Sequence, residues 1–291
     1  MAAERFEVRR LVDVAEYRQL ERVQQAVWGF VDADTVPLHT LVAVGTHGGL
    51  VLGAFDHERP SERRLVGMAF GFDGRDERGV KHHSHQLGVE PDVAGAGLGR
   101  RLKWLQRDEV LRGGVPRITW TFDPLMAMNA WFNVRVLGAV CDRYRVDVYG
   151  QIRDVLNAGL ATDRMVVDWW LASPRVVGRS RGEVPPPRFD GAGAQDLVDV
   201  EADPGSGLRV PRAWHAPTAE RARLEIPADL QTLKADHPEA ADTWRHVTRE
   251  AFLAAFAAGF VVTDVDRRDG RVFYLLEARP PSEGPLEGPA S

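Results

Sequence analysis

Cysteine is nearly absent from this chain of 291 residues, which has a single thiol at Cys141. One cysteine excludes an intrachain disulfide, and it favours a reducing compartment in which Cys141 serves as a small buried apolar side chain. No apolar run approaches the roughly 18 to 20 residues that span a bilayer. The N-terminal residues lack the apolar stretch of a secretory signal. We therefore expect a cytoplasmic protein with no membrane partner.

A strong excess of charge of one sign is also lacking. The sequence has 37 Lys and Arg against 42 Asp and Glu, a formal net charge of -5. This balance gives no broad electrostatic case for a nucleic-acid partner. A hydrophobic fraction of 44% and a charged fraction of 27% are typical of a globular protein with an ordinary core. Any binding of an anionic ligand must therefore depend on local groups of Lys and Arg rather than on the net charge.

The most informative stretch is a glycine-rich turn between a predicted strand at 81–89 and a predicted helix from Leu98 to the Gly113-Gly114 pair. Apolar residues at Leu98, Leu102 and Leu105 have the spacing of one helical face. The turn and the helix start consist of Ala94, Gly95, Ala96, Gly97, Leu98 and Gly99, followed by Arg100 and Arg101.

Such a turn favours the binding of an anion. The first backbone N–H groups of a helix have no helical partner and lie at the positive end of its dipole. The glycines at 95, 97 and 99 allow an anion to approach the backbone closely. Arg100 and Arg101 add positive charge. The sequence therefore predicts a site for a phosphate or a pyrophosphate.

Two common phosphate-binding motifs do not fit. The phosphate-loop pattern of NTPases needs Lys and then Ser or Thr after its glycine, whereas Gly99 is followed by Arg100 and Arg101. The dinucleotide pattern read from Gly95 needs a third glycine at position 100 and an acidic residue about twenty positions further on. Position 100 is arginine, and the residues around Arg117 are not acidic.

The segment resembles the pyrophosphate-binding motif of the GCN5-related N-acetyltransferase (GNAT) superfamily, Q/R-x-x-G-x-G/A. Gly97 and Gly99 fall on its two small positions, and Ala94 departs from its Gln or Arg. The strand end Leu87, Gly88 and Val89 is similar to the usual Leu-x-Val. The resemblance implies that acetyl-CoA or another acyl-CoA binds with its pyrophosphate on the amides of 95–99 and its pantetheine arm antiparallel to the strand.

The predicted element order also resembles this family from residue 6 to 149. It implies an α/β (α+β) fold in which a mixed, mostly antiparallel central sheet is flanked by helices, with a smaller C-terminal α+β extension. Strands are predicted at 6–12, 50–55, 65–72, 81–89, 118–122 and 141–149, and helices at 13–28, 37–44, 98–113 and 126–137.

The expected domains are an acyl-CoA-binding domain at 1–150, an extension at 151–279 and a disordered tail at 280–291. The extension either packs on the first domain or is part of a degenerate second unit of the same kind. In the extension we predict a strand at 165–171, a linker at 175–207, a helix opening at His237-Pro238, and a hairpin whose turn contains Asp269-Gly270.

A second specific resemblance lies in the segment from Asn129 to Ala139, which is similar to the last helix of the family. The sequence WTFDPL at 120–125 resembles the corresponding sequence in a subfamily of predicted bacterial acyltransferases. Asn129 and Asn133 are four apart, hence on one helical face, and are candidates for cofactor binding. The tyrosine that protonates the leaving thiolate in the family is replaced by Val134, so that role is vacant or moves to Tyr144, Tyr149 or a water.

Direct attack of an amine on the thioester needs a neutral amine and therefore a base. His85, Gln86 through a water, and Asp123 are the candidates. A period of two places His85 on the same strand face as Leu87. Asp123 ends a strand next to Pro124, where it can equally cap the turn. The oxygen of the tetrahedral intermediate needs a donor, for which an N–H near Val89 is expected.

The histidines at 82, 83 and 85 do not predict a metal site, because no acidic or cysteine partner lies at ligand spacing and neighbouring side chains of a strand point to opposite faces. We expect a small-molecule amine or amino acid as acceptor, and the acyl group can be acetyl or larger, such as succinyl. The sequence leaves open whether the protein forms a homodimer. The alternative function is a non-catalytic acyl-CoA-binding or regulatory module, favoured by Val134 and Ala94.

Overall fold

The computed structural model describes residues 5–30, 34–150, 159–184 and 193–278. The expected tail at 280–291 lies outside these residues, as does the proline run of the expected linker. The chain forms two compact units, one up to Trp120 and one from Thr121. The domain boundary expected near residue 150 stays a prediction.

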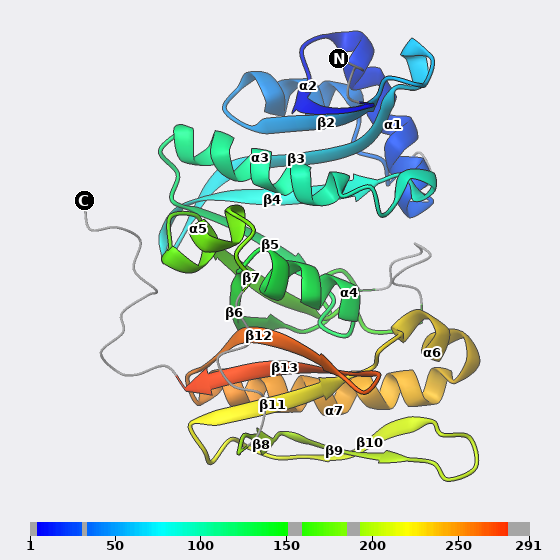
Figure 1. Ribbon diagram of the computed structural model, residues 1–291, viewed down its shortest axis with the longest axis vertical. Coiled ribbons are helices and arrows are strands. Elements are labelled where there is room, and N and C mark those ends of the chain that lie inside the picture. Colours follow the sequence, from blue (N-terminus) through cyan, green and yellow to red (C-terminus); the bar gives the residue numbers. More distant parts are fainter. Residues whose placement is uncertain (1–4, 31–33, 151–158, 185–192, 279–291) are drawn as a thin grey trace. The chain divides into compact units, whose positions relative to one another are not determined.

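The first unit is built on a mixed sheet with the strand order β1-β2-β3-β4-β5 (Figure 1). Each neighbouring pair is antiparallel except β4 and β5, which are parallel. The strands are β1 (Phe6–Arg10), β2 (Leu50–Asp56), β3 (Leu65–Asp76), β4 (Gly79–Val89) and β5 (Arg117–Phe122), the last of which runs into the second unit.

Helices α1 (Val14–Trp28) and α2 (Leu38–Thr46) cover one face of this sheet. The side chain of Asp13 caps α1 by accepting from the N–H of Glu16 at 3.0 Å, and Gly29 ends the helix in a left-handed conformation, with φ 67°. Both helices contribute to a core in which α1 and α2 residues meet strand residues such as Met68 and Phe70. A β-carbon on Gly88 would meet Trp28, so Gly88 faces α1.

Helix α3 (Leu98–Arg112) packs on β1 to β4 from the opposite face. Alternation along β4 turns Val89 away from the α1 side, and a β-carbon on Gly99, in the first turn of α3, would lie 3.9 Å from Val89. The expected helix is confirmed, with Gly113 at its C-terminal end. Leu98 and Leu102 are buried as expected, whereas Leu105 is only half-buried. The short 3₁₀ turns η1 (Ser61–Arg63) and η2 (Pro91–Val93) complete this unit.

The second unit contains a mixed sheet in which β6 pairs with both β7 and β12, and β13 follows β12. Cys141 of β6 pairs with Val262 of β12, so a strand expected to end the acyl-CoA domain shares a sheet with the C-terminal hairpin. Its strands are β6 (Val140–Arg145), β7 (Arg164–Trp170), β8 (Gln195–Asp196), β11 (Arg221–Ile226), β12 (Phe260–Arg268) and β13 (Arg271–Ala278); β9 (Val198–Ala202) and β10 (Arg209–Trp214) form a separate ribbon.

The hairpin between β12 and β13 is confirmed, with Asp269 and Gly270 at φ 51° and 72° in its turn. The helix opening at His237-Pro238 is also confirmed as α7, which buries an apolar face that includes Trp244 and Phe252. The second unit contains the helices α4 (Ala127–Ala130), α5 (Pro174–Ser180), α6 (Leu230–Asp236) and α7 (Pro238–Ala257), and the π-helix η3 (Trp131–Val136).

Two expectations for this unit are wrong in detail. The linker expected at 175–207 contains α5 and the strands β8 and β9, because the capping Ser173, whose hydroxyl accepts from Val176, starts a short helix there. The helix expected at 126–137 is one turn of α-helix followed by a π-helix, in which the N–H of Leu137 reaches back five residues to Phe132.

The predicted fold class is confirmed: a mixed, mostly antiparallel arrangement of strands with flanking helices, in the predicted order of elements from β1 to β6. In the described part of the chain, none of the helices combines the length and the apolar character needed to cross a membrane. Cys141 is a buried free thiol, as expected, and burial raises its pKa.

Candidate functional site

The glycine turn forms an open cradle at the start of α3. Gly95 and Gly97 have φ 89° and 75°, values that favour glycine, and a β-carbon on either would meet nothing within 4 Å. Gly97 is the N-cap residue and provides no side-chain cap. The hydrogen bonds of α3 begin at Arg101, whose main-chain N–H donates to the carbonyl of Gly97 at 3.0 Å. The amides of 98–100 are therefore directed at the open space.

The flanking residues of the cradle are exposed, but the two arginines behave differently. Ala94, Gly95, Ala96 and Gly97 are all exposed, whereas Leu98 is buried and anchors the helix start. Arg100 is exposed and adds charge near the cradle. Arg101 donates through Nη2 to the carbonyl of Phe6 at 3.1 Å, so it holds α3 on β1 and its place in anion binding stays a prediction.

The strands β4 and β5 pair over a short length in the part of β4 that precedes its cradle end. Their parallel ladder covers His82 and His83 on β4 against Ile118 and Thr119 on β5. Beyond this point β4 continues from Ser84 to Val89 toward the cradle without a recorded β5 partner. The splay of β4 from β5 that the GNAT resemblance implies for the pantetheine arm stays a prediction.

A β-bulge changes the face on which His85 lies. Phe70 pairs with Gln86 and the next β3 residue pairs with Ser84, so His85 is the extra residue of β4. Its ring packs edge-on against Phe70, with centroids 5.1 Å apart. Leu87 pairs with the neighbour of Phe70 and lies on the other face. The expectation that His85 and Leu87 share a face is therefore wrong, because the bulge interrupts the period of two.

His85 belongs to an aromatic cluster with Phe70, Phe72 and His83. It keeps solvent contact, yet packing in this cluster partly buries the ring and lowers its pKa. Burial lowers the pKa of His83 to about 4, helped by the nearby charges of His85 and Lys81. Both imidazoles are thus neutral near pH 7, and the low pKa makes His83 a weak proton acceptor at that pH. Within the described residues, the side-chain oxygen of Gln86 is buried without a hydrogen-bond partner.

Sequence reasoning missed a buried polar cluster beneath α3. Lys103 is 2% exposed and donates to the hydroxyl of Ser84 at 2.8 Å and to the side-chain oxygen of Gln106 at 3.1 Å. The amide nitrogen of Gln106 lies 3.4 Å from Nε2 of His82, whose Nδ1 is 2.7 Å from Asp73. The apolar pattern did not reveal it, because Lys103 lies about 100° around the helix from Leu102 and away from the expected face of Leu98, Leu102 and Leu105.

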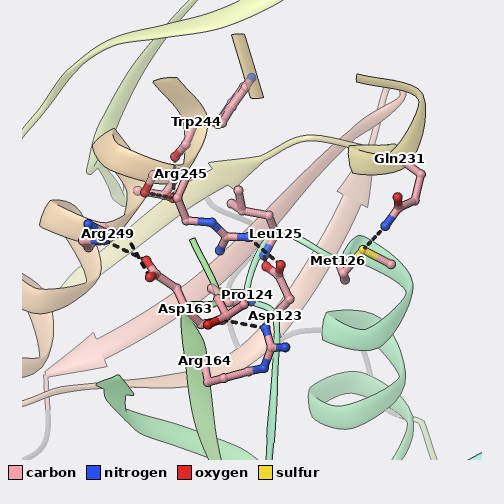
Figure 2. A network of polar contacts seen from close by, with 12 residues as sticks. Asp123, Pro124, Leu125, Met126, Asp163, Arg164, Gln231, Trp244, Arg245 and Arg249 are labelled. Carbon is pink, nitrogen blue, oxygen red and sulfur yellow. Dashed lines mark hydrogen bonds and ion pairs between the residues drawn. The ribbon is translucent and has the colours of Figure 1, made fainter. Parts of the chain in front are cut away.

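In the second unit, Asp123 is engaged on both carboxylate oxygens (Figure 2). One oxygen accepts from the N–H of Leu125 at 2.9 Å, which closes the turn after β5. The other accepts from the guanidinium of Arg245 on α7, whose side chain is fully buried. This geometry fits the turn-capping reading of Asp123, and a catalytic role for it stays a prediction.

Tyr144 is also engaged in the second unit. Its hydroxyl donates to Asp163 at 2.7 Å, and Asp163 in turn accepts from Nε of Arg249 at 2.7 Å (Figure 2 shows the pair of Asp163 and Arg249). Burial raises the pKa of Tyr144, with the negative charge of Asp163 acting in the same direction. The hydroxyl proton is thus held in a structural bond, and its use as an acid stays a prediction.

The two asparagines expected on one face differ in environment. Asn129 in α4 is exposed, whereas Asn133 in the π-helix is 5% exposed. The wider π-turn breaks the 3.6-residue period on which the same-face expectation was based. Val134 is fully buried, and its carbonyl accepts from Arg175, so the position of the family's tyrosine is part of the core. Cofactor contacts of Asn129 and Asn133 stay predictions.

Among the described residues, His, Cys, Asp and Glu side chains form no group of three or more that could hold a metal ion. The three neighbouring histidines of β4 divide between the two faces: His82 is buried beside Asp73 and Gln106, while His83 and His85 join the aromatic cluster. The groups available for chemistry are therefore the backbone amides of the cradle, the neutral imidazoles of His83 and His85, and the buried amino group of Lys103.

No protein-family model matches this sequence, and no curated protein matches it either. Solved structures do match. The ribosomal-protein-S18-alanine N-acetyltransferase from Escherichia coli is 15% identical, with 58% of this chain and 95% of that chain covered and a TM-score of 0.44. A candidate acetyltransferase of the GNAT family from Desulfovibrio desulfuricans is 18% identical, with 57% and 99% covered and a TM-score of 0.45.

A candidate acetyltransferase from Salmonella typhimurium, solved with its cofactor acetyl-CoA, is 20% identical, with 59% of this chain and 98% of that chain covered and a TM-score of 0.44. The chain is thus similar in structure to acetyltransferases of the GNAT kind. Its function is inferred from the residues of its own site.

Proposed function

We propose that this protein is an acyl-CoA-dependent N-acyltransferase that acts on the amine of a small molecule or an amino acid. The observation that carries the proposal is the open cradle at Gly95–Gly99, which lies at the end of β4 beyond the short β4–β5 ladder. The acyl group is acetyl or a larger group such as succinyl. The co-substrate is the acyl-CoA, with no metal required.

The cradle suits the diphosphate of coenzyme A for electrostatic reasons. The amides of 98–100 and the helix dipole offer fixed partial positive charge, and the exposed Arg100 adds a full one. Missing side chains at Gly95 and Gly97 leave room for phosphate oxygens to reach the backbone. The pantetheine arm then runs back along β4, and the N–H groups of Leu87 and Val89, which point away from β3, are available to the carbonyl of the thioester.

In this mechanism the acceptor amine attacks the carbonyl carbon of the thioester directly. The attacking nitrogen must first lose a proton, because an ammonium has no lone pair. His85 is the proposed base, directly or through a water held by Gln86, since its lowered pKa keeps the imidazole neutral. Tetrahedral collapse breaks the carbon–sulfur bond and releases the thiolate of CoA.

The cradle is tested with two variants of equal size, Gly97→Asp and Gly97→Asn. Asp and Asn both tolerate left-handed backbone and both cap a helix, so each variant should keep the fold. The carboxylate of the Asp variant repels the diphosphate, and we expect calorimetry to show CoA affinity at least tenfold weaker than in the Asn variant. Equal affinity of both variants and the wild type would place CoA elsewhere and refute the proposal.

A second candidate, a non-catalytic acyl-CoA-binding module, is favoured by one observation. Asp123 and Tyr144, two of the predicted catalytic residues, are tied to Arg245 and Asp163 in structural contacts. Acetyl-CoA or succinyl-CoA mixed with a pool of amino acids and small amines separates the two functions. Release of free thiol supports the enzyme, and tight CoA binding without thiol release over all amines supports the module.

A further inference from the structure

A cavity of about 140 Å³ lies in the second unit, where β11 leads into α6. Its wall is formed by the start of β10, the end of β11, the helices α6 and α7, and the turn between β12 and β13. Three residues of this wall, Ala228, Asp229 and Gly270, are exposed, so the cavity reaches the surface. A β-carbon on Gly270 would meet nothing within 4 Å. The space is therefore accessible to a ligand.

One part of the wall is apolar and consists of Leu208, Ile226, Leu233 and Trp244. Trp244 is 1% exposed, and its indole N–H donates to the carbonyl of Arg209 at 3.0 Å, which fixes the ring in place. An apolar cavity of about 150 Å³ holds one benzene molecule. The cavity therefore has the size and the lining for a small branched alkyl group or a phenyl group.

The other part of the wall contains two arginines that share one buried carboxylate. Glu225 is 4% exposed. Arg209 donates to it through Nε at 2.7 Å and through Nη2 at 3.0 Å. Arg271 donates to it through Nε at 3.1 Å and also through Nη2. Two guanidinium groups against one carboxylate leave this group of three side chains with one positive charge in excess.

Both arginines bind Glu225 with the same edge of the guanidinium, which leaves the second edge unused. A guanidinium is planar and carries five N–H groups, so the edge formed by Nη1 and Nη2 stays available when Nε and Nη2 are engaged. In the described part of the chain, neither Arg209 nor Arg271 makes a hydrogen bond through Nη1. Their side chains are 35% and 37% exposed. Such an edge binds a carboxylate in a bidentate manner.

The remaining acidic residue of the wall, Asp229, is engaged elsewhere. Its carboxylate caps α6, where it accepts from the N–H groups of Gln231 at 3.0 Å and Thr232 at 3.1 Å. It also accepts from the hydroxyl of Thr232 at 2.8 Å. Asp229 therefore does not compete for the free edges of the arginines, and these edges are left to a ligand.

We propose that this cavity binds a small organic carboxylate with a branched alkyl or phenyl body. The carboxylate of the ligand takes the free edges of Arg209 and Arg271, while Glu225 holds both guanidinium groups in position. The body of the ligand packs on Trp244 and Leu233. The cradle belongs to the first unit and the cavity to the second, so this inference does not rest on the proposed function.

Two kinds of molecule carry this chemistry, a simple carboxylic acid and an apolar amino acid. Calorimetry of the full chain with isovalerate and with leucine compares them. Isovaleramide, which has the shape of isovalerate without its charge, is the control ligand. We expect isovalerate to bind at least tenfold more tightly than isovaleramide, because only the carboxylate pairs with the arginines. Tighter binding of leucine than of isovalerate would identify the ligand as an amino acid, whose ammonium is attracted by Asp229.

Arg271→Gln assigns the binding to this cavity. Arg209 still pairs with Glu225 in this variant, so the buried carboxylate keeps a partner and the fold should be kept. We expect at least tenfold weaker binding of isovalerate and of leucine. Arg268→Gln is the matched control. Arg268 lies opposite Arg271 in the same hairpin but outside the cavity wall, so this variant should keep the wild-type affinity.

A second variant, Leu208→Trp, fills the space and keeps both arginines. Its position precedes β10 and is only half-buried, which makes it tolerant of a larger side chain. Binding should again be at least tenfold weaker, because the body of the ligand loses its place. This variant provides the answer if Arg271→Gln fails to fold.

Three results would overturn the proposal: no binding of either carboxylate at about 10 mM, equal affinity for isovalerate and isovaleramide, or unchanged affinity in the folded Arg271→Gln and Leu208→Trp variants. Both variants should bind CoA like the wild type. A wild type that binds isovalerate but not CoA refutes the proposed function and leaves this site in place.

Discussion

Asp123 and Arg245 form an ion pair in which the arginine side chain is fully buried. The pair joins the end of β5 to α7 within the second unit. Removal of one partner leaves a buried charge without compensation, which typically costs about 3 to 5 kcal/mol. Asp123 therefore has a structural role that must be separated from any role in catalysis.

We expect Asp123→Asn and Arg245→Met each to lower the free energy of unfolding by about 3 kcal/mol, because each leaves its partner unpaired. The double variant should be less destabilised than the sum of the two, with a coupling of about 1 to 3 kcal/mol. Urea unfolding of the four proteins provides the measurement. Additive losses would show that the two residues do not stabilise the protein through one another.

His85→Gln should remove the acid limb of the pH profile of kcat/KM. The pKa of His85 is lowered from the usual imidazole value of about 6.5, so activity of the wild type should fall only at a pH below that value, where the ring takes up a proton. The kcat/KM of the variant should be at least tenfold lower at pH 7, and it should not change with pH on the acid side of the profile. His246→Gln, on the exposed side of α7, is the control and should keep the wild-type profile. An unchanged profile in His85→Gln would exclude this base.

Lys103→Met should be more stable than the wild type at pH 6, by a margin that shrinks as the pH rises. The ammonium of the folded wild type is destabilised by burial, and its pKa of about 7 lies below the value near 10.4 expected for an unfolded chain. Between these values the unfolded state binds the extra proton, so wild-type stability increases with pH, by at most about 1.4 kcal/mol per pH unit.

Urea unfolding at pH 6, 8 and 10 measures this margin. Lys81→Met provides the comparison for a lysine that reaches the surface. A margin for Lys103→Met that stays constant with pH would show that burial does not hold its ammonium in a costly state.

Tyr144→Phe should affect stability more than turnover. The hydroxyl donates to a buried carboxylate, a type of bond that is worth about 1.5 to 3 kcal/mol, while Arg249 continues to hold Asp163. We expect a loss in that range by thermal unfolding and a change of less than tenfold in kcat. A loss of kcat above a hundredfold with unchanged stability would instead identify Tyr144 as the acid.

Local signals predicted the helices and hairpins well. Asp13 before α1, Pro238 at the first position of α7 and the Asp269-Gly270 turn act through their own backbone, so the sequence alone identifies them. The cradle was equally visible, because Gly95 and Gly97 are required by left-handed backbone rather than by distant contacts.

Features that depend on partners far along the chain were not visible. The bulge at His85 is a property of the pairing with β3, and the ion pair of Asp123 needs Arg245, 122 positions later. The π-helix reverses the environment of Asn133 relative to Asn129. Lys103 was overlooked for a different reason: a charged residue in an amphipathic helix is usually assigned to the solvent side, and only the packing of α3 on β4 reveals its burial.

The extra residue in β4 has a consequence for how this strand can vary in length. Because His85 has no counterpart on β3, its deletion would leave the partners of Ser84 and of Gln86 unchanged. The shortened strand would regain a regular pleat, with the cradle and the Lys103 cluster still on one side. The length of β4 can thus change by the one residue that carries this imidazole while the β3–β4 register on both sides is kept.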